Sequence, residues 1–213
     1  MEFLDPQLDA YVCAHSTDEP PLLQELNRKT YLEVLQPRML SGHFQGRVLS
    51  MFSHMIKPRR VLEIGTYTGY SALCFAEGLS DDGKVFTIDV NEELEELVRQ
   101  YISKSGIEEK LEYLVGDAAH FIPALNEEWD IVFIDADKKS YIKYYELVFD
   151  KVKKGGYIIA DNVLWSGKVL EEYDTLDRET KIIMDYNTMV HNDPRVEHVL
   201  LPIRDGLMIA RKL

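Results

Sequence analysis

Residues 60–71 of the chain read Arg-Val-Leu-Glu-Ile-Gly-Thr-Tyr-Thr-Gly-Tyr-Ser. The apolar run Val61–Ile64 is typical of a strand that is covered on both faces, and a helical pattern follows it. Between them, Gly65 and Gly69 allow a tight turn and a close approach of the backbone to a ligand. The stretch therefore predicts the first strand, turn and helix of an α/β sheet.

Further β-rich runs alternate with helical patterns along the chain, which is the order of a doubly wound α/β fold. The expected strands are Arg60–Ile64, Lys84–Asp89, Leu111–Val115, Asp130–Ile134 and Tyr157–Ala160. The expected helices are Ser71–Leu79, Asn91–Ser105, Tyr141–Val152, which should stop at Gly155-Gly156, and Asp174–Val190. A short turn joins the β-rich runs Val196–Leu201 and Leu207–Arg211, so they must be antiparallel, because a parallel crossover needs a dozen or more residues. We therefore predict a mostly parallel sheet with a C-terminal antiparallel hairpin and helices on both faces.

The composition excludes several classes of protein. The 213 residues include 24 Lys and Arg and 37 Asp and Glu, which gives a net charge of −13 and argues against broad binding to nucleic acid. The two cysteines, Cys13 and Cys74, form no disulfide framework. Neither a signal peptide nor a membrane-spanning apolar run is visible, so a cytoplasmic location is expected. The length predicts a single structural domain, in which residues 1–58 are a helical extension of the sheet domain over residues 59–213.

Acidic residues stand at the predicted carboxyl ends of the first three strands, where ligands bind in open α/β sheets. Glu63 precedes the glycine turn and would favour a cationic ligand over a phosphate. Asp89 ends the second strand and can accept hydrogen bonds from both hydroxyls of a ribose. Asp117, after the third strand, can accept one from an adenine amino group or cap the next helix. Together these positions favour a nucleoside ligand, although each also fits a purely structural turn.

A second group of polar residues follows the fourth and fifth strands. Asp135 ends one of them, and Asp161 and Asn162 end the other. If these strands are neighbours, two carboxylates and an amide oxygen converge, and this hard ligand set suits Mg²⁺, Mn²⁺ or Ca²⁺. The alternative is that the acids are unrelated caps and turns. The six histidines are expected to form no close pair at metal spacing: His15, His43, His54, His120, His191 and His198.

At these residues the sequence resembles the class I S-adenosylmethionine-dependent methyltransferases. It resembles most closely the cation-dependent O-methyltransferases typified by the caffeoyl-CoA and catechol enzymes. Three motifs carry the resemblance: Glu-x-Gly-x-x-x-Gly-x-Ser at 63–71, Asp-Ala-Asp-Lys at 135–138 followed by Tyr141, and Asp-Asn-x-Leu-Trp-x-Gly at 161–167. They occur in the family's order and spacing. The resemblance implies a Rossmann-like methyltransferase sheet, with S-adenosylmethionine bound by the catalytic domain over residues 59–213.

The resemblance also implies a role for each matched residue. The residues expected to bind the donor are Met39, Ser41 and Gly42, which close over it, Glu63, Gly65, Tyr67 and Ser71 at its methionine portion, Asp89 at its ribose, Asp117 and Ala118 at its adenine, and Asp135. The expected metal ligands are Asp135, Asp161 and Asn162. Lys138 matches a proposed general base, so Lys138 and Asp135 are the expected catalytic residues, and Trp165, Lys138 and Asp205 are expected to bind the acceptor.

The predicted activity is transfer of the methyl group of S-adenosylmethionine to a hydroxyl of a small catechol-like acceptor, assisted by a divalent cation, with Mg²⁺ expected first. One alternative is a tRNA wobble-uridine (5-hydroxyuridine) O-methyltransferase on the same fold, which the net charge of −13 disfavours. Another is a non-catalytic nucleoside-binding module, against which the complete metal set and Lys138 argue. A dehydrogenase is disfavoured by the glycine spacing. The expected partners are a phenolic small molecule and a second copy of the chain, with no membrane.

Overall fold

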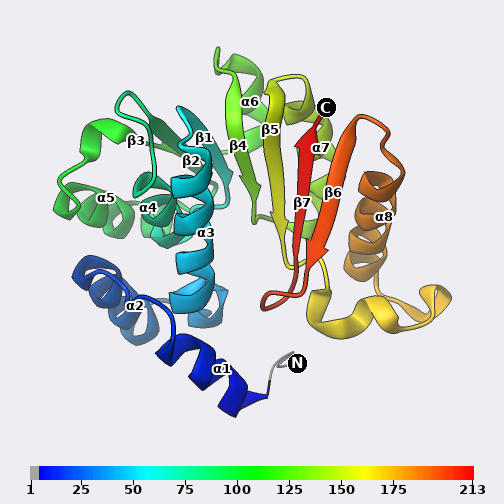
Figure 1. The fold of residues 1–213 in the computed structure, drawn as a ribbon, viewed down its shortest axis with the longest axis horizontal. Helices are drawn as coiled ribbons and strands as arrows, with labels where there is room; N and C mark the ends of the chain where they lie inside the picture. Colours follow the sequence, from blue (N-terminus) through cyan, green and yellow to red (C-terminus); the bar gives the residue numbers. More distant parts are fainter. Residues whose placement is uncertain (1–4) are drawn as a thin grey trace. The chain divides into compact units, whose positions relative to one another are not determined.

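The structure is a computed structural model, which describes residues 5–213 of the chain. Its contacts divide residues 6–213 into two compact units, Pro6–Ala118 and Ala119–Leu213, called here the N-terminal and the C-terminal unit. Each unit contains strands and the helices that pack on them (Figure 1). The predicted fold class is confirmed, because the strands are mostly parallel and the chain ends in an antiparallel hairpin.

The N-terminal unit is built on three parallel strands in the order β3-β2-β1. Its elements are α1 (Pro6–Ala14), α2 (Pro21–Glu33), α3 (Gly42–Ile56), β1 (Arg60–Ile64), α4 (Tyr70–Ala76), β2 (Lys84–Asp89), α5 (Glu95–Lys104) and β3 (Leu111–Val115). The three strands have the bounds that the sequence predicts. The interior side chains of β1 and β2 are buried, whereas Glu112 and Leu114 inside β3 are half-buried. Continuous apolar runs therefore identify β1 and β2 most clearly.

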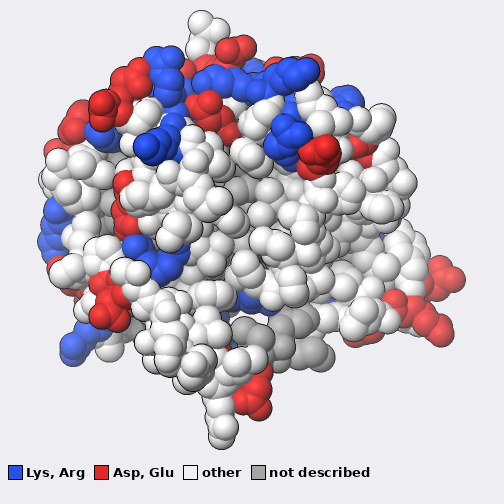
Figure 2. Space-filling model, in the orientation of Figure 1, with Lys and Arg blue, Asp and Glu red and all other residues white. Residues whose placement is uncertain are grey.

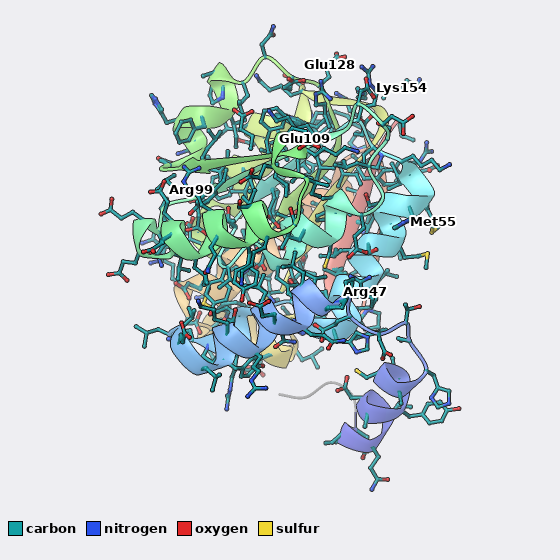
Figure 3. All side chains as sticks on the ribbon, turned by 90° about the vertical axis from the view of Figure 1, so that its left-hand side faces the viewer. Arg47, Met55, Arg99, Glu109, Glu128 and Lys154 are labelled. Carbon is teal, nitrogen blue, oxygen red and sulfur yellow. The ribbon has the colours of Figure 1, made fainter. Side chains whose placement is uncertain are left out.

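Helices α3 and α4 pack closely in this unit. A Cβ added at Gly46 on α3 would lie 2.6 Å from the ring of Tyr70 on α4, so only glycine allows this approach. Arg47, labelled in Figure 3, extends from the same helix to Glu77, which follows α4, and their side chains form an ion pair of 2.7 Å. All seven residues of α4 are buried. The helix that follows the glycine turn is therefore held in place by packing.

The C-terminal unit contains four strands in the order β4-β5-β7-β6. Its elements are α6 (Ala118–Ala124, whose first residue still belongs to the N-terminal unit), β4 (Trp129–Ile134), α7 (Tyr141–Phe149), β5 (Val152–Asp161), α8 (Arg178–Asn192), β6 (Val196–Leu201) and β7 (Leu207–Lys212). Strands β4 and β5 are parallel, and β7 runs antiparallel to both β5 and β6. Figure 1 shows these strands side by side, with α8 next to β6.

The predicted end of the helix after Tyr141 is wrong. The helix stops at Phe149, and β5 begins at Val152, so that Gly155 and Gly156 lie inside the strand. Gly155 has a φ of +82°, and the pairing of β5 with β4 shifts register there. The glycines therefore mark an irregularity in a strand and do not end a helix.

Other helix boundaries differ from the predicted ones by a few residues. Helix α4 ends at Ala76, and α8 begins at Arg178, because Asp177 accepts a hydrogen bond of 2.8 Å from the backbone N–H of Thr180 and caps it. Helix α5 begins at Glu95, and Asn91 caps a short 3₁₀ turn ahead of it. The proposed domain boundary at residue 58 stays a prediction. Within residues 5–213, no helix combines the length and apolar character that a membrane span requires.

Candidate active site

Asp89, the last residue of β2, binds the glycine turn between β1 and α4 through a hydrogen bond. Gly65 and Gly69 have φ values of +103° and +86°, which side chains other than glycine rarely adopt. One carboxylate oxygen of Asp89 accepts a hydrogen bond of 2.7 Å from the N–H of Tyr67, and the other accepts one of 2.9 Å from Asn91. A carboxylate has about four acceptor positions, so Asp89 can still accept from the hydroxyls of a ribose.

Glu63 lies beside this turn at the end of β1, and its side chain is fully buried. Its carboxylate accepts a hydrogen bond from the hydroxyl of Thr87, which lies 2.5 Å from the hydroxyl of Thr66. A buried carboxylate is costly unless hydrogen bonds or a cation stabilise it. This arrangement is suited to a cationic ligand, such as a sulfonium, close to the turn.

The upstream segment also reaches the glycine turn. The hydroxyl of Tyr67 lies within hydrogen-bond distance of two backbone carbonyls, those of Leu35 at 3.1 Å and Gln36 at 3.2 Å. Of the residues predicted to close over the donor, Ser41 is buried and Met39 is 59% exposed. The tyrosine hydroxyl thus binds the segment that precedes Met39, a contact that the motif alone does not reveal.

Apart from Asp135, which follows β4 in the C-terminal unit, the remaining predicted donor residues lie in the same unit. Gly42 follows Ser41 at the start of α3, and Ser71 is buried in the first turn of α4. Asp117 is exposed after β3, next to Ala118, which is buried at the start of α6. The N–H of Gly116 donates to the carbonyl of Asp89 at 2.7 Å, so the ends of β2 and β3 are directly connected.

In the C-terminal unit, the polar residues after β4 and β5 meet around one ammonium group. Ile134 pairs with Ala160, so Asp135, the residue after β4, stands at the level of Asp161, the last residue of β5. The Nζ atom of Lys138 lies 2.8 Å from Oδ1 of Asn162 and 3.4 Å from Oδ1 of Asp135. The side chains of Asp135 and Asn162 therefore lie close together, as expected for residues at the ends of neighbouring strands.

These oxygen atoms fit a divalent cation. Asp135 and Asn162 already direct oxygens to a positive charge, and Asp161, which is 3% exposed, precedes Asn162 and accepts a 2.6 Å hydrogen bond from its backbone N–H through Oδ1. Oxygen ligands of this kind are those that Mg²⁺ and Ca²⁺ prefer. Within residues 5–213, no three His, Cys, Asp or Glu side chains gather as a metal site, and the predicted set has only two carboxylates and an amide.

Tyr141 is a further member of this site. Its hydroxyl is 2.5 Å from Nζ of Lys138 and donates to the backbone carbonyl of Asp161 at 2.9 Å. Burial, helped by the negative charges of Asp135 and Asp161, raises the pKa of Tyr141 well above its usual value. Sequence reasoning gave this residue no role, although its position three residues after Lys138 at the start of a helix was a usable signal.

Asp205 holds the loop that carries Trp165. A carboxylate oxygen of Asp205 accepts a 2.6 Å hydrogen bond from the N–H of Ser166, and its backbone carbonyl accepts one of 2.8 Å from Leu164. Burial raises the pKa of Asp205. The ring of Trp165 lies 5.8 Å from Nζ of Lys138. Trp165 is therefore placed beside the lysine, whereas the visible contacts of Asp205 are with the loop.

The spacing of the histidines in the sequence predicts no metal-type pair, but two histidines meet in the fold. Nδ1 of His191 at the end of α8 lies 3.2 Å from Nε2 of His198 on β6. The two residues are far enough apart in sequence that only the packing of α8 on β6 brings them together. With only two ligands on the surface, this pair does not form a metal set.

Known proteins resemble this chain over nearly its whole length. Residues 13–213 match the model of the O-methyltransferase family. Caffeoyl-CoA O-methyltransferase 5 of Nicotiana tabacum is 34% identical over 206 residues, which cover 92% of this chain and 85% of that relative. The chain belongs to the O-methyltransferase family. The predicted family and enzyme class are thereby confirmed.

Solved structures of methyltransferases agree with this assignment. The SAH-bound methyltransferase PaMTH1 of Podospora anserina has a TM-score of 0.89 and 27% identity, and the match covers 97% of this chain and 94% of that one. The O-methyltransferase of Bacillus cereus in complex with SAH also has a TM-score of 0.89 and 27% identity, with 97% of each chain covered. TomG of Streptomyces achromogenes, solved with SAM, has a TM-score of 0.89 and 25% identity over 97% of this chain and 96% of its own.

Proposed function

We propose that this O-methyltransferase transfers the methyl group of S-adenosylmethionine to a hydroxyl of a small vicinal diphenol with the help of a divalent cation. The observation that carries the proposal is the gathering of the Asp135 and Asn162 oxygens around the ammonium of Lys138 at the ends of β4 and β5. It supports both a cation site and a basic side chain at the same place.

The donor half of the proposal rests on the N-terminal unit. S-adenosylmethionine carries a positive sulfonium, a ribose and an adenine. Glu63 offers a buried negative charge, and Asp89 retains acceptor capacity for the ribose hydroxyls. The sulfonium loses its charge during transfer, so these acids should favour donor binding more than the chemical step. The solved relatives that contain SAM or SAH support the same donor here.

The acceptor half rests on the C-terminal unit. A phenol with a pKa of about 10 is ionised to only about one part in a thousand at pH 7, and the phenolate is the competent nucleophile. A divalent cation held by Asp135, Asp161 and Asn162 would stabilise that anion. As the neutral amine, Lys138 would take the phenolic proton and become the ammonium, and Trp165 would form a wall for the ring. Alignment of the phenolic oxygen with the methyl group would lower the activation barrier by up to ~7–11 kcal/mol.

The natural acceptor is tested by a labelled-donor assay. The panel contains catechols, flavonoids, hydroxycinnamates, a hydroxycinnamoyl-CoA ester and bulk tRNA, each with Mg²⁺ and with excess EDTA. The thioester is included because curated relatives are named caffeoyl-CoA O-methyltransferases. We expect methylation of vicinal diphenols only when Mg²⁺ is present. Full activity in EDTA would remove the cation from the mechanism, and labelling of tRNA alone would replace the phenolic acceptor.

A matched pair of variants within the Asp-Ala-Asp-Lys motif separates the cation site from the fold. Asp135→Asn weakens an oxygen ligand beside Lys138 and should lower turnover at least 100-fold. Asp137→Asn is the control, because the Asp137 carboxylate accepts hydrogen bonds from the hydroxyls of Ser140 at 2.7 Å and Tyr144 at 3.0 Å. It should retain turnover within a few-fold. Equal losses in the two variants would contradict a cation role for Asp135.

A further inference from the structure

The ammonium group of Lys138 makes more hydrogen bonds than its sequence motif predicts. A lysine ammonium has three N–H donors, and here it has three oxygen acceptors, on Tyr141, Asn162 and Asp135. The side chain of Lys138 is only 8% exposed. Its position is therefore set by these three contacts and not by solvent.

The three acceptors differ in what else they are proposed to do. Asp135 and Asn162 belong to the proposed cation ligands. An oxygen that coordinates a divalent cation has less capacity for an ammonium group, and the two positive charges repel each other. Tyr141 is the acceptor that a cation would leave free to bind Lys138.

Tyr141 is itself rigidly placed. Its side chain is fully buried, and its ring packs edge-on against Tyr186 of α8 at 5.5 Å between centroids. The hydroxyl hydrogen is donated to the carbonyl of Asp161, so an oxygen lone pair is available to Lys138. The carbonyl of Ile134 lies 3.3 Å from the same hydroxyl. The phenol thus connects the ends of β4 and β5 to the lysine.

We propose that Tyr141 is a positioning residue that holds Nζ of Lys138 at the ends of β4 and β5, including when Asp135 and Asn162 bind a cation. The inference rests on the role given to Lys138 in the proposed function. Tyr141 acts through Lys138 and not by touching the donor or the acceptor.

The test compares Tyr141→Phe with Tyr186→Phe. Both variants remove one hydroxyl from the same buried aromatic cluster. The hydroxyl of Tyr186 has no hydrogen-bond partner among the described residues, so its removal measures the general effect of losing a buried hydroxyl there. The first readout is the ¹H–¹⁵N signal of the Lys138 ammonium, assigned by its loss in Lys138→Gln and recorded with and without Mg²⁺. Such a signal is visible only when the group exchanges slowly with water.

We expect the signal in the wild type and in Tyr186→Phe, with and without Mg²⁺, and we expect its loss in Tyr141→Phe. The second readout is steady-state kinetics, in which Tyr141→Phe should lower kcat 10- to 100-fold while the KM for S-adenosylmethionine stays within two-fold. A Lys138 signal that survives in Tyr141→Phe, that is absent from the wild type, or that disappears from the wild type with Mg²⁺ overturns the proposal. So does unchanged kcat in Tyr141→Phe. If the wild type methylates no acceptor, the proposed function fails, and the ammonium signal still decides the role of Tyr141.

Discussion

Among single residues, the buried carboxylate of Glu63 depends on the hydroxyl of Thr87. Sequence reasoning selected Glu63 for its charge beside a glycine turn, but it could not show that a threonine from the adjacent strand would satisfy it. Thr87 stands opposite Glu63 in the parallel register of β1 and β2. Because that register is a tertiary feature, the contact is visible only in the fold.

Replacing Thr87 by valine should destabilise the protein while preserving its shape. The β-branched side chain is kept, but the hydrogen bond to Glu63 and the contact with Thr66 are lost. A buried polar group left without its partner costs about 1–3 kcal/mol. Urea unfolding should show a loss of this size, with an unchanged m-value. Thr188→Val, at an exposed position on α8, is the control. A loss below about 0.5 kcal/mol in Thr87→Val, the usual range for surface substitutions, would show that Glu63 does not need this hydroxyl.

The site residues differ in whether the neighbouring sequence is enough to identify their roles. Strand-end acids such as Asp89 and Asp135 were found because the chain order alone places them at the ligand-binding edge of the sheet. The anchoring roles of Tyr141 and Asp205 were not found. Tyr141 contacts a carbonyl 20 residues away, and Asp205 holds a loop about 40 residues earlier in the chain. Distances of this kind depend on the whole fold.

At the scale of elements, the sequence predicted the bounds of the buried strands, but it did not predict the structure around Gly155 and Gly156. The bounds of β1, β2, β3 and β6 agree with the predicted ranges, because covered strands are continuous apolar runs and the hairpin has a short turn. Gly155 and Gly156 were misread because a glycine ends a helix and bends a strand equally well. The structure decides between the two, since β5 starts before these glycines.

The turn between β6 and β7 should depend strictly on Gly206. Its φ is +91°, and a Cβ there would lie 2.5 Å from Cγ of Leu164. Gly155→Ala is the matched control, because Gly155 also has a positive φ, +82°, but no atom within 4 Å of an added Cβ. The control should cost about 1–2 kcal/mol from backbone strain alone. Gly206→Ala should cost more and should raise the KM for the acceptor, because the same turn holds the Trp165 loop. Equal unfolding free energies for the two variants would contradict this steric account.

Asp193, at the end of α8, should make stability depend on acid pH. Its hydrogen bonds to the side chain of Arg195, together with those from Tyr145 and the Arg195 backbone, lower its pKa to about 2. Because the folded pKa lies below the unfolded value near ~4, the stabilisation is complete above about pH 4 and is lost as the pH falls toward 2. Urea midpoints of wild type and Asp193→Asn should therefore differ at pH 5 and converge toward pH 2. A constant difference over this range would show that the charge of Asp193 is not the cause.

At the scale of the whole molecule, charge and exposed apolar surface bear on partners. The net charge is −13, but the chain carries many basic as well as acidic residues. Figure 2 shows basic and acidic side chains next to one another on the face it displays. That mixture gives no reason to expect a polyanion as partner. The exposed apolar residues gather on the first helices instead: Leu8 is 49%, Tyr11 60%, Leu32 72% and Met55 75% exposed. Met55, labelled in Figure 3, lies near the end of α3.

The partner expected from the sequence is a second copy of the chain, and we propose that it binds to these exposed side chains of the N-terminal helices. A stable interface buries about 800 Å² per partner around an apolar centre. A charge placed in that centre should therefore separate the subunits, whereas the same change elsewhere should not. We expect light scattering to give twice the chain mass of 24.7 kDa for the wild type and the single chain mass for Leu32→Asp. Leu170→Asp is the control, because Leu170 is 88% exposed in the C-terminal unit and lies outside these helices. A monomeric wild type, or a Leu32→Asp variant that stays dimeric, would contradict an interface on the N-terminal helices.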